Sequence, residues 1–207
     1  MKNKEYGTVL NWNYVIISLV FVTIFTLLVL YMPSMREIDV NILHAIRQAL
    51  APYPAYIPNF ITDFGREYYM FWPQLAAGSV LVSHKKYTKA FLLILFTQLS
   101  FVVTDAMKNF VCRQRPCGDS YPGFSFPSGH SSTTMTLYGI LIYLVLRYTS
   151  KGFWRYFLVT LFSLFIFMCG LSRLWLGLHF LSDVLAGMFL GFLLVNLFII
   201  ITKYLND

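Results

Sequence analysis

Residues 153–201 read FWRYFLVTLFSLFIFMCGLSRLWLGLHFLSDVLAGMFLGFLLVNLFIII, which is two long apolar runs with a polar stretch between them. The runs, Phe153–Leu171 and Val184–Ile201, can each cross a bilayer, because a spanning helix needs about 20 mostly apolar residues. The stretch that separates them contains Arg173, His179 and Asp183. Ionisable side chains beside a span are costly, so we expect these three to have a function.

Other segments of the chain are also apolar enough, or nearly so, to be spans. They are Tyr14–Met32, Tyr68–Val82, Ala90–Met107 and Thr133–Leu146. The sequence therefore predicts an all-α polytopic membrane protein with six transmembrane helices, formed by one domain over residues 1–207. The first span is followed by no small-x-small cleavage pattern, so we interpret it as a retained anchor and not as a signal peptide.

The composition agrees with this prediction and excludes several classes of protein. Hydrophobic residues make up 57% of the chain and charged residues 12%, which is about half the charged share of an ordinary globular protein. A soluble chain of 207 residues has too little interior volume to bury so many apolar side chains. The formal charge of +7 comes from 16 basic and nine acidic residues that form no dense basic stripe, so nucleic-acid binding is not expected.

A short helix is predicted between the first two spans. Ser34 and Glu37 have the spacing of an N-terminal capping box, and Pro52 is expected to end the helix. One apolar face of this helix would be lined by Ile38, Ile42, Ile46 and Ala49. We interpret this segment as a helix in the outer membrane interface, which either covers the bundle or takes part in lipid entry.

The positions of Lys and Arg predict the orientation in the membrane. If the spans alternate, these residues are more frequent on the side of the N-terminus, and the positive-inside rule places both termini in the cytoplasm. The difference in the number of Lys and Arg between the two sides is larger if Lys108, Arg115 and Arg173 belong to a binding site. They are then not counted among the interfacial cations of the other side. We therefore expect a multi-pass cell-membrane protein whose site lies on the extracytoplasmic face.

Three groups of polar residues are predicted to meet at that face. They contribute Lys108, Arg115, Ser128, Gly129, His130, Arg173, His179 and Asp183. Arg and Lys side chains can surround a multiply charged anion. The Ser-Gly-His stretch opens a helix, where free backbone N–H groups point at an anion and glycine lets it come close. The sequence therefore predicts a phosphate-binding site.

The two histidines of this set provide a nucleophile and an acid. His179 and Asp183 are four residues apart, which places them on one face of a helix. A carboxylate beside Nδ1–H leaves Nε2 with the free lone pair and stabilises the imidazolium that forms on attack. His130 could then protonate the leaving alkoxide.

Each of these residues also has another interpretation when it is taken alone. A single Lys or Arg near the end of a span is more often an interfacial anchor, and a single histidine is as often a packing residue. For the whole chain, an anion transporter is a second class of function, although polar residues within the spans are sparse. A lipid phosphotransferase is a third class, because the same histidine chemistry would serve it.

The chain has three cysteines. Cys169 lies within a predicted span, where a free cysteine usually packs as a small apolar residue. Cys112 and Cys117 fall in a loop that we place outside, where oxidation is possible. Local geometry decides whether they can form a bridge, so the free and the bonded forms both stay open.

The order and spacing of the polar residues resemble the signature of the type 2 phosphatidic acid phosphatase superfamily, which also includes the vanadium haloperoxidases. Three patterns are similar: Lys-x6-Arg-Pro from Lys108, Pro-Ser-Gly-His from Pro127, and Ser-Arg-x5-His-x3-Asp from Ser172. The resemblance implies that His179 is the nucleophile, Asp183 its partner and His130 the general acid. It implies phosphate binding by Lys108, Arg115, Ser128, Gly129 and Arg173.

The same resemblance implies a membrane lipid phosphate phosphatase that hydrolyses a phosphomonoester or pyrophosphate headgroup through a phosphohistidine. The small single-domain form is similar to the bacterial phosphatidylglycerophosphatase B group, which favours phosphatidylglycerophosphate as substrate and phosphatidylglycerol as product. Undecaprenyl pyrophosphate is the alternative. No metal or other cofactor is expected, since the acidic residues are scattered along the chain and a divalent site needs several converging oxygen ligands. The expected partners are the lipid substrate and the bilayer, without nucleic acid or an obligate protein partner.

Overall fold

The protein is all-helical in the computed structural model, which describes residues 2–205 and the side chains of residues 12–205 except those at positions 67 and 119. No strand occurs in this part of the chain. The helices are α1 (Lys2–Tyr31), α2 (Pro33–Leu50), α3 (Tyr56–Asp63), α4 (Glu67–Ser83), α5 (Tyr87–Val111), α6 (Gly129–Tyr148), α7 (Phe153–Trp175) and α8 (Leu181–Tyr204). A 3₁₀ turn at Gly118–Ser120 lies in the loop between α5 and α6.

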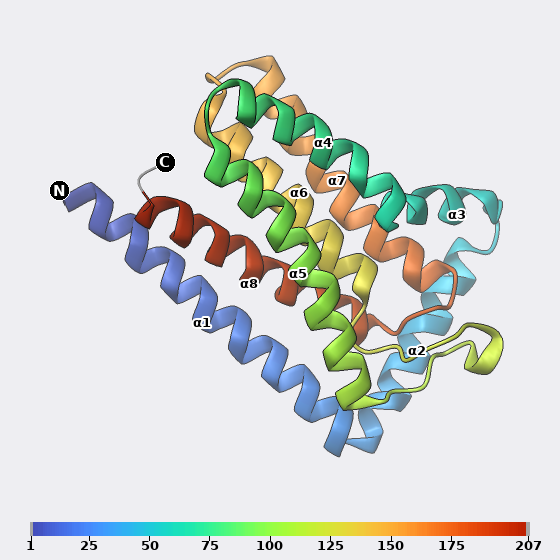
Figure 1. The fold of residues 1–207 in the computed structure, drawn as a ribbon. Helices are drawn as coiled ribbons and strands as arrows, with labels where there is room; N and C mark the ends of the chain where they lie inside the picture. The colour runs from blue at the N-terminus through green and yellow to red at the C-terminus, as the bar shows by residue number, and fades with distance from the viewer. Residues whose placement is uncertain (1, 206–207) are drawn as a thin grey trace.

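Helices α1 and α4 to α8 form a bundle, and α2 and α3 lie at one of its ends (Figure 1). The centre of the bundle is formed by α6 and α8: α8 contacts α1, α5 and α6, and α6 also contacts α7. The beginning of α1 and the end of α8 lie at the end of the bundle opposite to α2 (Figure 1). The loops after α5 and after α7, and the start of α6, therefore come together at the α2 end.

Four helices in the described part of the chain are long and apolar enough to cross a membrane. They are Trp12–Tyr31, Tyr87–Val111, Phe153–Trp175 and Leu181–Tyr204. The predicted spans Tyr68–Val82 and Thr133–Leu146 fall in α4, which has 17 residues, and in α6, whose first turns are rich in Ser and Thr. The chain is thus a multi-pass membrane protein with several spans, whereas the count of six remains a prediction for α4 and α6.

The segment between α1 and α4 contains two helices where one was predicted, and the first of them begins earlier than predicted. Helix α2 begins at Pro33, and no side chain caps it, so the predicted capping box at Ser34 is wrong. The reason is that the fixed φ of proline at the first helical position starts the helix earlier. Helix α3 was not predicted from the sequence. Pro58 lies in its first turn, where proline is tolerated.

The face of α2 that packs on the bundle is not centred on the predicted apolar residues. Asp39 and Leu43 are its buried residues, and Ile46 packs against the same cluster. Ile38, which belongs to the predicted apolar face, is 49% exposed. The apolar pattern alone was misleading because a buried carboxylate occupies the centre of this face.

Two glycines of α8 let it approach the backbone of α6. A Cβ atom added at Gly187 would lie 2.4 Å from the carbonyl oxygen of Ser128, and one at Gly191 would lie 2.5 Å from that of Ser132. Small residues allow this close packing between helices in membranes. As a result, the start of α6 lies against the start of α8, and the backbone N–H of Ser128 donates to the carbonyl oxygen of Asp183 at 2.9 Å.

We predict that Gly187→Ala lowers the free energy of unfolding by about 1–3 kcal/mol, the usual cost of overpacking, because the added methyl meets backbone and not a movable side chain. Thermal unfolding in detergent measures this. Gly78→Ala in α4 is the control, since no atom lies within 4 Å of its added Cβ, and it should be neutral or slightly stabilising. Equal unfolding temperatures for the two variants would contradict the packing argument.

Candidate active site

His179 lies in the short loop between α7 and α8 and is 1% exposed. Its Nε2 atom is 3.2 Å from a terminal guanidinium nitrogen of Arg115, which places the Nε2 lone pair towards the cations of the site. Burial lowers the pKa of His179 to about 4, although the Asp183 carboxylate opposes this effect. The imidazole is therefore neutral at physiological pH and its lone pair is available for attack.

Asp183 stands behind His179, at the N-terminus of α8, and is fully buried. Its Oδ2 atom is 3.5 Å from Nδ1 of His179, which is too long for a hydrogen bond, and accepts a hydrogen bond from the backbone N–H of Phe180 at 2.8 Å. The carboxylate thus caps α8 as well as facing the imidazole. Its position is fixed by the backbone of the helix that it begins.

The three predicted cations come from different elements and converge on the histidines. Lys108 lies in the last turn of α5, Arg173 in the last turn of α7, and Arg115 in the loop after α5. Arg115 is held by backbone carbonyl groups, since Nε donates to Gly123 at 2.9 Å and a terminal nitrogen donates to Leu178 at 3.1 Å. A guanidinium held by neutral carbonyls keeps its full charge for an anion.

Arg173 is the most enclosed of these cations, with 3% of its surface exposed. One of its terminal nitrogens donates to the hydroxyl of Thr62 in α3 at 2.6 Å, and its Nε has no hydrogen-bond partner among the described residues. A buried guanidinium is stable only if its charge is compensated. A multiply charged anion bound between Arg173, Arg115 and Lys108 would supply that compensation.

The start of α6 provides the remaining predicted residues. Ser128 is the N-cap, as expected, and its hydroxyl accepts from the backbone N–H of Ser131 at 3.4 Å. A Cβ added at Gly129 would lie 3.8 Å from Nζ of Lys108, so the glycine leaves room beside that ammonium group. Lys108, Gly129 and His130 line a cavity of about 460 Å³ between α5 and α6.

His130 is fixed by close packing on one side of its ring. A Cβ at Gly65 would lie 2.8 Å from Cδ2 of His130 and 2.7 Å from Sγ of Cys169, so no larger residue fits at position 65. The Nε2 atom of His130 is buried and has no hydrogen-bond partner in the described part of the chain. Cys169 is itself buried, as predicted, and Cys112 and Cys117 are free thiols.

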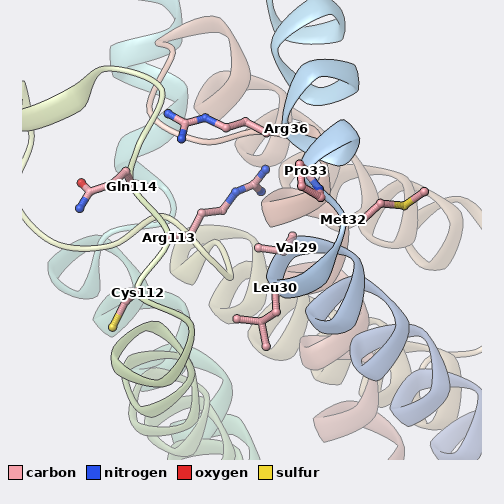
Figure 2. Close-up of a pocket in the computed structure, with 8 residues that line it drawn as sticks. All are labelled: Val29, Leu30, Met32, Pro33, Arg36, Cys112, Arg113 and Gln114. Atoms are coloured by element: carbon pink, nitrogen blue, oxygen red, sulfur yellow. The ribbon is translucent and has the colours of Figure 1, made fainter.

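Two residues of the site were not expected from the sequence. Arg113 donates to Asp183 Oδ1 at 2.6 Å and to Asp39 Oδ2 at 2.7 Å, so one guanidinium joins two buried carboxylates. Figure 2 shows Arg113 between the α1–α2 junction and the loop after α5, where it borders a cavity of about 410 Å³. The available signals were the place of Arg113 between Lys108 and Arg115 and the presence of Asp39 in the short helix predicted between the first two spans.

The geometry brings all eight predicted residues to one end of the bundle. Two histidines, a carboxylate, three cations and a helix N-terminus surround one region. Within the described residues, no three His, Cys, Asp or Glu side chains gather in a way that could hold a metal ion. Such a site can bind a phosphoryl group and attack it with a histidine nitrogen.

Comparisons with known proteins give related sequences and folds. The chain is 28% identical over 142 residues to phosphatidylglycerophosphatase B of Bacillus subtilis (strain 168), which covers 65% of this chain and 68% of that protein. It is 29% identical over 162 residues to bacitracin transport permease protein BcrC of Bacillus licheniformis, covering 65% and 73%. A crystal structure of a transmembrane PAP2-type phosphatidylglycerolphosphate phosphatase from Bacillus subtilis has the same fold, with a TM-score of 0.78, 23% identity, and coverage of 92% of this chain and 96% of that one.

The family comparison covers the region that contains every predicted site residue. The model described as the PAP2 superfamily matches residues 89–207. This range includes Lys108 at its beginning and Asp183 towards its end, and it makes up more than half of the chain. The protein is therefore a member of the PAP2 superfamily.

Proposed function

We propose that this protein is a membrane lipid phosphatase that hydrolyses a phosphomonoester or pyrophosphate headgroup through a phosphohistidine on His179. The observation that supports this most strongly is the buried, neutral His179, with Nε2 3.2 Å from Arg115 and Asp183 on its other side. This arrangement directs a nucleophilic lone pair into a cluster of cations. The names of its relatives, phosphatidylglycerophosphatase B and lipid phosphate phosphatase delta, agree with the proposal.

In the first step, the Nε2 lone pair of His179 attacks phosphorus and forms an N–P bond. The bond between phosphorus and the leaving oxygen of the lipid breaks, and His130 gives its proton to that oxygen. Lys108, Arg115 and Arg173 stabilise the charge on the other phosphoryl oxygens, together with the N–H groups that open α6 at Ser128 and Gly129. Asp183 stabilises the positive charge that develops on the imidazole.

In the second step, water replaces the histidine. Its oxygen attacks the phosphohistidine, and His130, which is now neutral, accepts a proton from it. The N–P bond breaks, its electron pair returns to His179 Nε2, and inorganic phosphate leaves. The cations of the chain supply the positive charge that this chemistry needs, so the proposal requires no metal ion.

Phosphatidylglycerophosphate is the substrate that we propose first, and undecaprenyl pyrophosphate is the alternative. The first choice rests on similarity to phosphatidylglycerophosphatase B of Bacillus subtilis. The cavity at Lys108 and His130 is also lined by Phe101 and Val102, and Val102 is 65% exposed on the outer surface of α5. A lipid could place its headgroup at the cations while its chains remain beside this apolar surface.

The orientation that we propose places both termini in the cytoplasm and the site on the extracytoplasmic face. The beginning of α1 and the end of α8 lie opposite the site, which agrees with both termini being on the same side of the membrane (Figure 1). The distribution of Lys and Arg supports this orientation over the reverse one.

We expect purified protein in detergent to release inorganic phosphate from phosphatidylglycerophosphate in the presence of a chelator and without an acceptor lipid. Release from undecaprenyl pyrophosphate, phosphatidate and diacylglycerol pyrophosphate should be slower. Vanadate should inhibit, because it mimics five-coordinate phosphorus. A requirement for added magnesium would contradict the mechanism, and turnover that depends on an acceptor lipid would indicate a phosphotransferase.

The two histidines should differ in their variants. His179→Ala should abolish turnover and the acid-labile, base-stable phosphoenzyme, because no other nucleophile faces phosphorus. His130→Ala should slow turnover by about 10²–10⁴-fold, and the loss should shrink for an aryl phosphate whose leaving group needs no proton. His44→Ala, at an exposed position of α2, is the control and should retain activity. A phosphoenzyme that persists in His179→Ala but is lost in His130→Ala would reverse the two roles.

We expect Cys112, which is an exposed free thiol, to react in whole cells with a maleimide that cannot cross the membrane. A cysteine introduced by Lys86→Cys, in the loop between α4 and α5, should react only after permeabilisation. Cys169 is buried and should contribute no label. The opposite labelling pattern would place the site in the cytoplasm.

A further inference from the structure

Asp39, Arg113 and Asp183 form a continuous chain of buried charges behind the nucleophile. Arg113 lies between the carboxylates and donates to both, at 2.7 Å to Asp39 and 2.6 Å to Asp183. The side chain of Arg113 is 9% exposed, and those of Asp39 and Asp183 are 1% and 0% exposed. Ion pairs with so little solvent contact are barely screened, so each charge acts strongly on the next.

We propose that Arg113 and Asp39 are positioning residues of the phosphatase site, which fix the Asp183 carboxylate and set the net charge that it presents to His179. This inference rests on the proposed function, because it assigns their effect to the histidine that attacks phosphorus. It adds a second layer to the site, formed by a loop residue and a residue of α2.

The orientation of the Asp183 carboxylate is fixed at both of its oxygens. Both oxygens of Asp183 are occupied, Oδ1 by Arg113 and Oδ2 by the backbone N–H of Phe180, so the carboxylate cannot rotate without losing a hydrogen bond. The guanidinium of Arg113 lies over the ring of Phe180, with 4.3 Å from its central carbon to the ring centroid. This stacking holds the guanidinium plane and therefore also the carboxylate that it binds.

Asp39 links Arg113 to the first turn of α8. Its Oδ1 accepts from the backbone N–H of Ser182 at 3.1 Å, and its Oδ2 accepts from Arg113 and from the hydroxyl of Ser182. The carboxylate thus attaches α2 to the first turn of α8, next to Asp183. An isolated buried charge at this place would be very unfavourable, so its pairing with Arg113 is a condition of the fold.

The charges of Asp39, Arg113 and Asp183 together determine the net charge beside His179. Arg113 alone would neutralise Asp183 and weaken its attraction for the imidazolium. Because Asp39 balances Arg113, the three groups together keep one negative charge beside His179. The other charged or titratable groups that act on His179 are Arg115 from the loop and Arg173 from α7, with His130 on α6 and Lys108 on α5 near them. All of these groups are cationic or neutral. The negative charge beside His179 therefore comes from Asp39, Arg113 and Asp183 taken together.

The proposal predicts opposite effects from removal of the two charges. Asp39→Asn removes a negative charge and should lower the pKa of His179, whereas Arg113→Gln removes a positive charge and should raise it. Each change should be about one pH unit, the size that Coulomb's law gives for a unit charge roughly 10 Å away at an effective dielectric constant of about 20. In Asp39→Asn/Arg113→Gln the two changes should cancel, while kcat should remain about tenfold or more below wild type because the carboxylate is no longer held.

The measurements are the pH dependence of phosphate release, with kcat and KM determined separately, and the ring ¹⁵N chemical shifts of His179 in the full-length protein. Arg113→Lys keeps the charge but not the forked geometry, so it should lower kcat without moving the pKa. It also provides a folded variant if Arg113→Gln leaves the carboxylates too unstable. Glu37→Gln and Arg36→Gln remove exposed charges of the same types from α2 and are the matched controls.

Shifts of the His179 pKa in opposite directions, with controls at the wild-type value, support the proposal. Unchanged pKa values, or shifts in one direction for both variants, overturn it and would assign Asp39 and Arg113 to stability alone. The NMR titration does not depend on turnover. If wild-type protein releases no phosphate, the proposed function fails, and the titration still decides whether these charges act on His179.

Discussion

The contact between the backbones of α6 and α8 determines the geometry of the whole site. Gly187 and Gly191 let the two helices meet without side chains between them, and Ser128 then donates from its backbone to Asp183. His130 follows Ser128 closely in α6, and His179 precedes Asp183 closely in the loop before α8. Their relative position is therefore set by main-chain packing, which is stiffer than any arrangement built from long side chains.

The electrostatics of the site depend on this packing, because it holds groups of like charge together. Lys108, Arg115 and Arg173 lie together at one end of the bundle. Carbonyl groups bind Arg115 and a hydroxyl binds Arg173 without neutralising either charge, so both charges remain available for an anion. Asp183 faces Nδ1 of His179, whereas Arg115 faces Nε2. The imidazole thus lies between a carboxylate that can stabilise its positive charge and the cations that we propose bind the anion.

Much of this could be predicted from the sequence, for identifiable reasons. The runs Phe153–Leu171 and Val184–Ile201 became α7 and α8 because apolar segments of this length have to be helical in a bilayer. The predicted site residues meet because loops of alternate helices lie at the same end of a bundle. Asp39 could not be found in this way. It lies 74 positions from Arg113, and the apolar pattern of α2 leaves out both of the residues that are buried there, Asp39 and Leu43. Gly65 was missed because its role depends only on the nearness of His130.

The part of the chain before residue 89 contains none of the motif residues, yet it completes the site. It supplies Asp39 to Arg113, Thr62 to Arg173, and Gly65, against which the ring of His130 packs closely. The region that matches the family model begins after all three. A fragment limited to that region would contain all eight predicted site residues but would leave Arg113 with one carboxylate and Arg173 without its hydroxyl. We therefore expect the smallest active unit of the proposed phosphatase to be larger than the stretch in which its motifs are found.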